Sequence, residues 1–159
     1  MTRAHVITVS DGAFHGTRED ASGAAVAALL EANHFETIKR EVVPDERDII
    51  ANAIADAADG GARLVITTGG TGLGPRDVTP QATREALDYD VPGLAEAMRR
   101  AGAEHTPMAA ISRGMAGVRG RALIINLPGS PKGAVESLEA VLPVLDHALA
   151  LLAGDTEHR

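Results

Sequence analysis

The stretch that most constrains the fold is residues 64–80, which read LVITTGGTGLGPRDVTP. It begins with a short apolar run at 64–66 between two glycine pairs, a pattern typical of a buried strand. A glycine-rich loop follows, and Thr79 and Pro80 then look like an N-cap and a first helical residue. A strand, a glycine loop and a helix in this order are typical of an anion site at the carboxyl end of a strand.

The loop has the residue types that bind phosphate. Its glycines lack a Cβ, so backbone N–H groups can approach a ligand closely, and its threonine hydroxyls add further donors. Arg76 can pair with a phosphate, and Asp77 can hold a metal ion. The loop matches neither a Walker A motif nor a G-x-G-x-x-G fingerprint. A plain turn without a ligand is the alternative, which the density of glycines, threonines and charges disfavours.

Strands and helices alternate along the rest of the chain. This alternation predicts an α/β fold with a mainly parallel sheet, and 159 residues fit a single domain spanning 1–159. We expect strands at 5–9, 37–43, 64–66 and 122–127, and helices at 23–32, 46–59, 81–87, 92–101 and 132–152, with Pro143 kinking or dividing the last.

Ligands of such sheets bind outside the carboxyl ends of the strands. Three loops are expected at that edge, 10–20, 67–77 and 128–132. The turn at Pro44 and Asp45 joins them if its strand runs in the same direction. The sequence therefore predicts one site built from several separate loops.

Composition excludes several classes of function. The net charge of −7 argues against a nucleic-acid partner, and the absence of cysteine excludes disulfides and thiolate metal sites. No apolar run approaches the ~20 residues of a membrane span, and no signal peptide is visible, so we expect a cytoplasmic protein without a membrane partner. Hydrophobic residues make up 45% and aromatic residues only 2%, so the core must be aliphatic.

One long segment contains basic residues and no acidic residues. Between Glu104 and Glu136 the only charged side chains are basic, at Arg113, Arg119, Arg121 and Lys132. Solvated surface charge is one interpretation, and a pocket for a ligand with more than one phosphate is the other. Lys132 at a helix start opposes the helix dipole, an objection that a bound phosphate would remove.

Two carboxylates are placed like metal ligands. Asp45 and Asp77 each follow a strand and precede a helix. Asp45 alternatively caps the helix at 46–59, and Asp77 alternatively pairs with Arg76. The functional interpretation is that both hold Mg²⁺, which prefers carboxylates together with substrate phosphates.

These motifs resemble the molybdopterin adenylyltransferase family, which comprises the MogA and MoaB proteins and the G domain of gephyrin. The matching segments cover nearly the whole domain, and TTGGTG followed by PRDVTP is the most specific. They are TVSD at 8–11, VPDE at 43–46, TTGGTG at 67–72, PRDVTP at 75–80, Ser112–Arg113, GVR at 117–119 and LIINLPGSP at 123–131.

The resemblance implies a three-layer α/β/α fold, a homotrimer and Mg²⁺-dependent adenylylation of molybdopterin by ATP, which releases pyrophosphate. It implies hand-over of the product to a molybdenum-insertion enzyme. The family's essential aspartates fall on Asp45 and Asp77, as catalytic and metal-binding residues. The substrate-binding set expected from the motifs and the resemblance is Thr68, Gly69, Gly70, Thr71, Gly72, Arg76, Ser112, Arg113, Pro128, Gly129, Ser130 and Lys132.

Two other functions stay open. One is a MoaB-type protein that binds molybdopterin without adenylylating it, against which the intact Asp45 and Asp77 argue. The other is an enzyme of the competence/NMN-deamidase type, which usually has a second domain, for which 159 residues leave no room.

Overall fold

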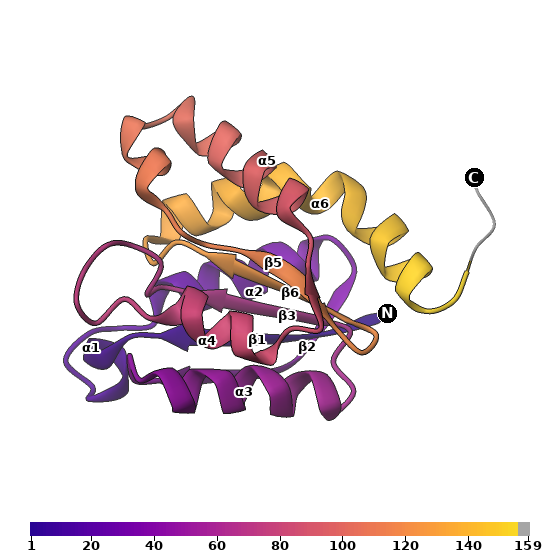
Figure 1. The fold of residues 1–159 in the computed structure, drawn as a ribbon, viewed down its shortest axis with the longest axis horizontal. Helices are drawn as coiled ribbons and strands as arrows, with labels where there is room; N and C mark the ends of the chain where they lie inside the picture. Colours follow the sequence, from indigo (N-terminus) through magenta and orange to yellow (C-terminus); the bar gives the residue numbers. More distant parts are fainter. Residues whose placement is uncertain (156–159) are drawn as a thin grey trace.

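The computed structural model describes residues 1–155, and its central element is a six-stranded sheet (Figure 1). Four strands are parallel: β1 (Thr2–Val9), β2 (Phe35–Val43), β3 (Leu64–Thr68) and β6 (Ala122–Leu127). Two short antiparallel strands, β4 (Tyr89–Asp90) and β5 (Ala116–Arg119), extend one edge. The order across the sheet is β2-β1-β3-β6-β5-β4.

Helices cover both faces of this sheet (Figure 1). The first face packs against α2 (Ala21–Ala32), α5 (Pro92–Ala103) and α6 (Pro131–Leu152), and the second against α3 (Arg47–Asp59) and α4 (Thr79–Ala86). A four-residue helix α1 (Asp11–Phe14) and a 3-10 helix η1 (Pro107–Ile111) lie in connecting segments. The three-layer α/β/α architecture is therefore confirmed.

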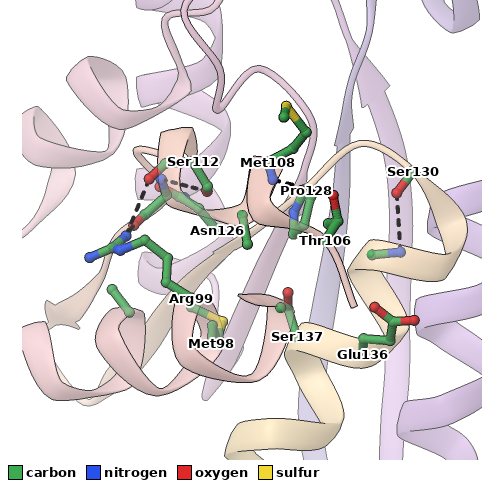
Figure 2. A pocket seen from close by; sticks show the side chains of 15 residues that line it. Met98, Arg99, Thr106, Met108, Ser112, Asn126, Pro128, Ser130, Glu136 and Ser137 are labelled. Atoms are coloured by element: carbon green, nitrogen blue, oxygen red, sulfur yellow. Dashed lines mark hydrogen bonds between the residues drawn. The ribbon is translucent and has the colours of Figure 1, made fainter. Parts of the chain in front are cut away.

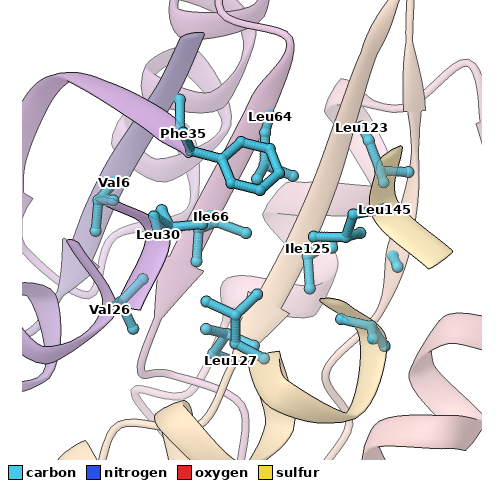
Figure 3. Packing of buried hydrophobic residues seen from close by; sticks show 14 of the residues in the cluster. Val6, Val26, Leu30, Phe35, Leu64, Ile66, Leu123, Ile125, Leu127 and Leu145 are labelled. Atoms are coloured by element: carbon cyan, nitrogen blue, oxygen red, sulfur yellow. The ribbon is translucent and has the colours of Figure 1, made fainter. Parts of the chain in front are cut away.

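The central strands are buried on both sides, which explains their continuous apolar sequence. Along β3, Leu64 and Ile66 join one core cluster, whereas Val65 joins the other, as the period of two requires. Figure 3 shows the first cluster, where Phe35 is the aromatic ring among aliphatic side chains. The expected aliphatic core is confirmed.

Some local expectations need correction. The sequence did not predict the two short strands, because β4 is two residues long and β5 lies in a glycine-rich segment with no alternating pattern. Helix α6 is not divided at Pro143 and runs unbroken to Leu152. Burial of Leu138, Val141 and Leu145 against the sheet offsets the hydrogen bond that proline cannot donate. On α3, Ile50 and Ile54 are buried whereas Ile49 is exposed.

The parallel register aligns the carboxyl ends of four strands at one edge. Thr8 pairs with Val42 and with Thr68, and Thr68 pairs with Leu127. The loops after β1, β2, β3 and β6 therefore meet there, as predicted. No helix within residues 1–155 is long and apolar enough to cross a membrane. The last four residues of the predicted domain lie outside the described part of the chain.

Candidate active site

A cavity of about 720 Å³ opens at the carboxyl edge of the parallel strands. Its walls come from the end of β1, the start of α2 and the loops after β2, β3 and β6. Seven of the predicted site residues line it, namely Asp45, Thr68, Gly69, Gly70, Asp77, Gly129 and Ser130. The tertiary structure thus assembles residues that are far apart in the sequence into one site.

The turn at Gly69 and Gly70, which begins the glycine-rich loop after β3, lines this cavity. Both residues have positive φ, 95° and 69°, a conformation that favours glycine. Thr79 holds the turn from two sides, since its backbone N–H donates to Gly70 O (3.1 Å) and its Oγ1 donates to Gly69 O (2.9 Å). The N-cap of α4 is therefore Val78 rather than Thr79, whose hydroxyl serves the glycine turn.

Gly72 has a different reason to be glycine. Its φ is not positive, in contrast to those of Gly69 and Gly70. A Cβ at Gly72 or at Gly74 would lie 2.9 Å from Asp77 Oδ2. The N–H of Gly74 donates to that same oxygen at 2.9 Å. These two glycines leave room for the Asp77 carboxylate inside its own loop.

Asp45 is joined to Asp11, which comes from the loop after β1. The N–H of Asp11 donates to Asp45 Oδ2, and the N–H of Asp45 donates to an oxygen of Asp11, both at 2.9 Å. The alternative role of Asp45 as a helix cap is wrong, because α3 is capped by Glu46 without a side-chain hydrogen bond. The Asp45 side chain is thus directed to the site edge rather than to the helix.

The electrostatic environments of the Asp45 and Asp11 carboxylates differ. Burial raises the pKa of Asp45, and the negative charges of Asp11 and Asp77 raise it further, while the hydrogen bond from Asp11 opposes the shift. The Arg76 guanidinium beside Asp11 lowers the pKa of that carboxyl, with help from the Asp45 N–H. Asp45 is consequently the site carboxylate whose ionisation the fold disfavours.

Arg76 pairs with Asp11 rather than with Asp77. Its Nε and Nη2 donate to the two carboxylate oxygens of Asp11 at 3.0 Å each, a bidentate arrangement. The alternative in which Asp77 pairs with Arg76 is therefore wrong. The contact links the glycine loop to the segment after β1, with the Arg76 side chain 58% exposed and that of Asp11 36% exposed.

The donor set suits a magnesium ion shared with a substrate. One oxygen of Asp45 and one of Asp77, Oδ1 in each case, accept no hydrogen bond from residues 1–155. Within the same range no group of three acidic, histidine or cysteine side chains could hold a metal by itself. These two oxygens could hold an ion only together with ligands from outside the described residues.

A second cavity has a volume of about 220 Å³, and Figure 2 shows the side chains that line it. It lies between α5, η1 and the start of α6, and its walls include Met98 and Met108. Three predicted residues line it, Ser112, Pro128 and Ser130. Ser130 lines both cavities, and its Oγ caps α6 by accepting from the N–H of Gly133 at 3.1 Å.

The basic segment does not converge on one pocket. Arg119 lies at the opposite edge of the sheet, opposite Ala122 in the register, and forms an ion pair with Asp59. Lys132 is exposed, with Nζ 3.9 Å from Glu136. Arg113 donates to backbone carbonyls of the glycine loop. Arg119 and Lys132 thus have acidic partners in space, whereas Arg113 binds neutral oxygens of the loop.

Some predicted residues line neither cavity. They are Thr71, Gly72, Arg76, Arg113 and Lys132. Other residues line the larger cavity although they were absent from the predicted set, among them Thr8, Ser10, Arg18 and Ser22. The signal that could have found Thr8 and Ser10 is their place in TVSD, at the carboxyl end of the first strand.

Comparison with known proteins agrees with this geometry. The family model described as a probable molybdopterin binding domain matches residues 5–147. The molybdopterin adenylyltransferase of Helicobacter pylori is 40% identical over 153 residues, covering 94% of this chain and 87% of the relative. That of Escherichia coli is 38% identical over 143 residues, covering 87% and 73%.

A solved structure shows the same architecture. The molybdopterin biosynthesis enzyme MoaB of a Thermus species is 58% identical, with a TM-score of 0.92 over 97% of this chain and 98% of that chain. The motif resemblance is confirmed, and the chain belongs to the molybdopterin-binding domain family.

Proposed function

We propose that this protein is a molybdopterin adenylyltransferase that uses ATP and Mg²⁺. The observation that carries the proposal is the position of Asp45 and Asp77 in one cavity with the turn at Gly69 and Gly70. The relatives of 40% and 38% identity bear that activity as their names. In the reaction, an oxygen of the terminal phosphate of molybdopterin attacks the α-phosphorus of ATP. The bond to the β-phosphate breaks, and pyrophosphate leaves with the electron pair.

The attacking phosphate is already an anion near neutral pH, so the reaction needs no general base. It needs alignment of two anions and stabilisation of the charge that develops between them. The amides of Gly70 and Thr71 donate to no acceptor within residues 1–155, which leaves them available for phosphate oxygens. The N-terminus of α6 adds its positive dipole end at Gly129 and Ser130.

Asp45 and Asp77 would hold the magnesium ion in this scheme. The ion supplies neutralisation of phosphate charge, which lowers the repulsion between the two substrates. Asp11 orients Asp45 through the reciprocal hydrogen bonds, and Gly74 orients Asp77. Both carboxylates are therefore fixed by backbone groups before a substrate arrives.

A second candidate is a MoaB-type binding function, since the neighbour at 58% identity bears the name MoaB. In that case the protein binds molybdopterin without transferring an adenylyl group. Release of pyrophosphate from ATP, measured with molybdopterin and Mg²⁺ present, separates the two functions. Release that depends on both substrates and disappears in Asp77→Asn supports the transferase, whereas molybdopterin binding without release supports the binding protein.

We also propose that the active form is a cytoplasmic homotrimer, which passes adenylylated molybdopterin to a molybdenum-insertion enzyme. Sedimentation equilibrium checks the assembly, because a trimer has three times the 16.4 kDa mass of the chain. A monomer at assay concentrations contradicts it. The hand-over is checked by co-sedimentation of the purified protein with such an enzyme, with and without product.

A further inference from the structure

The side chain of Arg113 donates hydrogen bonds to the glycine loop and to α4. Its Nε donates to Gly72 O at 2.9 Å, its Nη2 donates to Asp77 O at 2.7 Å, and its Nη1 donates to Gln81 Oε1 at 3.2 Å. The backbone N–H of Arg113 donates to Thr71 O at 2.8 Å. One residue from the segment before β5 thus binds both ends of the loop and the first turn of α4.

This pattern is that of a clamp rather than of a ligand contact. All three partners are neutral oxygens, and they lie in different directions that only a planar, forked guanidinium can serve together. The side chain is half-buried and does not line the cavity that contains Asp45 and Asp77. Its effect on that cavity is therefore indirect, through the backbone of the loop.

The loop has little else to fix its far end. Within residues 1–155, the carbonyls of Gly72 and Asp77 have Arg113 as their hydrogen-bond partner. The remaining contacts of the segment are local: Gly74 N–H binds Asp77 Oδ2, and Asp77 N–H binds Gly74 O at 3.0 Å. Arg76 reaches Asp11, but that ion pair is exposed and therefore weak.

We infer that Arg113 is a positioning residue, which holds the backbone of residues 72–77 so that the Asp77 carboxylate stands opposite Asp45 in the larger cavity. The expected change in kcat rests on the proposed function, whereas the expected change in the order of the loop does not. It replaces the direct contact between Arg113 and the anionic pterin that the motifs suggested. A contact of that kind needs the charge of residue 113, whereas a clamp needs its shape.

Arg113→Lys separates shape from charge. Lysine keeps the positive charge but cannot donate to three diverging oxygens at once. We expect roughly a tenfold to hundredfold fall in kcat with KM for molybdopterin changed by less than about threefold, because a misplaced Asp77 impairs the reaction more than binding. Arg113→Ala should behave the same way. Recovery of activity in Arg113→Lys, or a loss confined to KM, would overturn the inference.

Chemical rescue gives a second readout. Arg113 also lines a separate surface cavity of about 280 Å³. Added guanidinium ion can therefore reach the space that Arg113→Ala leaves. We expect guanidinium at millimolar concentration to restore part of kcat in Arg113→Ala, whereas ammonium at the same ionic strength does not. Equal rescue by both ions would show that charge alone matters and would overturn the clamp.

Hydrogen exchange tests the structural part without any substrate. In Arg113→Lys the amides of Gly74 and Asp77 should exchange roughly tenfold faster than in the wild type, because the loop loses its clamp. The amide of Leu123, which donates to Arg63 O at the opposite edge of the sheet, is the internal reference. Unchanged exchange in the loop overturns the inference, even if the protein has no transferase activity.

Arg84 offers a matched control. It lines the same surface cavity as Arg113, is exposed, and has no hydrogen-bond or ion-pair partner within residues 1–155. Arg84→Lys should leave kcat, KM and loop exchange unchanged. Gln81→Ala removes one of the three acceptors and should reproduce part of the Arg113→Lys effect, but add little to it in the double variant. If the effects of Gln81→Ala and Arg113→Lys add fully in the double variant, the two residues do not act in one clamp.

Discussion

Asp11 and Asp45 hold each other by two hydrogen bonds of 2.9 Å, in which the backbone N–H of each donates to the carboxylate of the other. The pair joins the loop after β1 to the loop after β2. A carboxylate fixed in this way keeps its orientation, but burial makes its charge costly, and the negative charges of Asp11 and Asp77 add to that cost. Asp45 therefore has the features of a group retained for function rather than for stability.

The first prediction is that Asp45→Asn loses activity without losing stability. The pKa of Asp45 is raised in the fold, so its contribution to the free energy of unfolding is greatest below the unfolded value of 3.8 and falls as pH rises through the folded pKa. Asparagine keeps an oxygen that accepts from the Asp11 N–H but removes the negative charge of the Asp45 carboxylate. At pH 7 we expect stability equal to or above wild type, with turnover reduced about 100-fold or more.

Urea denaturation at pH 7 and at pH 3 checks this sign. The difference in free energy of unfolding between Asp45→Asn and wild type should shrink at the lower pH, where Asp45 is protonated in both the folded and the unfolded state. A variant that is clearly less stable than wild type at pH 7 would show that the ionised carboxylate supports the fold.

The second prediction concerns Asp77. Asp77→Asn keeps the shape and the acceptor for the Gly74 N–H, but removes the charge proposed to hold the metal ion. Turnover should fall far more than molybdopterin affinity. Asp59→Asn is a suitable control, since that carboxylate pairs with Arg119 at the opposite edge of the sheet. Turnover of Asp77→Asn within a few-fold of wild type at saturating Mg²⁺ would remove Asp77 from the metal site.

The third prediction distinguishes the glycines of the loop. Gly70→Ala combines a positive φ of 69° with a Cβ that would overlap Thr79 Oγ1, so both the turn and its anchor are disturbed. We expect a loss of about 1–3 kcal/mol in the free energy of unfolding, together with weaker nucleotide binding. Gly72→Ala should keep its thermal midpoint within a few degrees, because the Cβ meets only the Asp77 carboxylate.

Gly93 in α5 provides the control for these variants. A Cβ at this position has no neighbour within 4 Å, and its φ is not positive, so Gly93→Ala should be neutral or slightly stabilising. Thermal melts and titrations with an ATP analogue measure both effects. If Gly72→Ala binds nucleotide and turns over normally, the space around Asp77 is not needed for function.

The fourth prediction concerns Lys132. Its only ionic neighbour within residues 1–155 is Glu136 at 3.9 Å, and the side chain is 83% exposed, so Lys132→Ala should cost less than about 0.5 kcal/mol of stability. If Lys132 binds a substrate phosphate, KM for ATP rises at low salt, and the effect shrinks as salt increases. Lys39→Ala, at a similarly exposed lysine on β2, should leave KM unchanged. Equal behaviour of the two variants would remove Lys132 from the site.

The positions of the main strands and helices could be predicted from the sequence because their signals are local. Runs such as 122–127 exclude water on both faces, and the glycines at 69 and 70 mark a turn that other residues rarely adopt. Asp45, Asp77 and the LPGSP segment could be assigned to one edge because parallel strands end together. The edge strand β4 could not, because two exposed residues have no periodicity.

The partners of the charged and polar side chains were decided only by the tertiary structure. Arg76 stands next to Asp77 in sequence but binds Asp11, and Thr79 is the first residue of α4 but its hydroxyl binds the glycine turn. Arg113, which was expected to bind substrate, has three protein acceptors. A hydrogen bond acts over about 3 Å, so its partner depends on which loops the strand order brings together. Local sequence sets the residue types available at each loop, and the packing of distant segments selects the pairs among them.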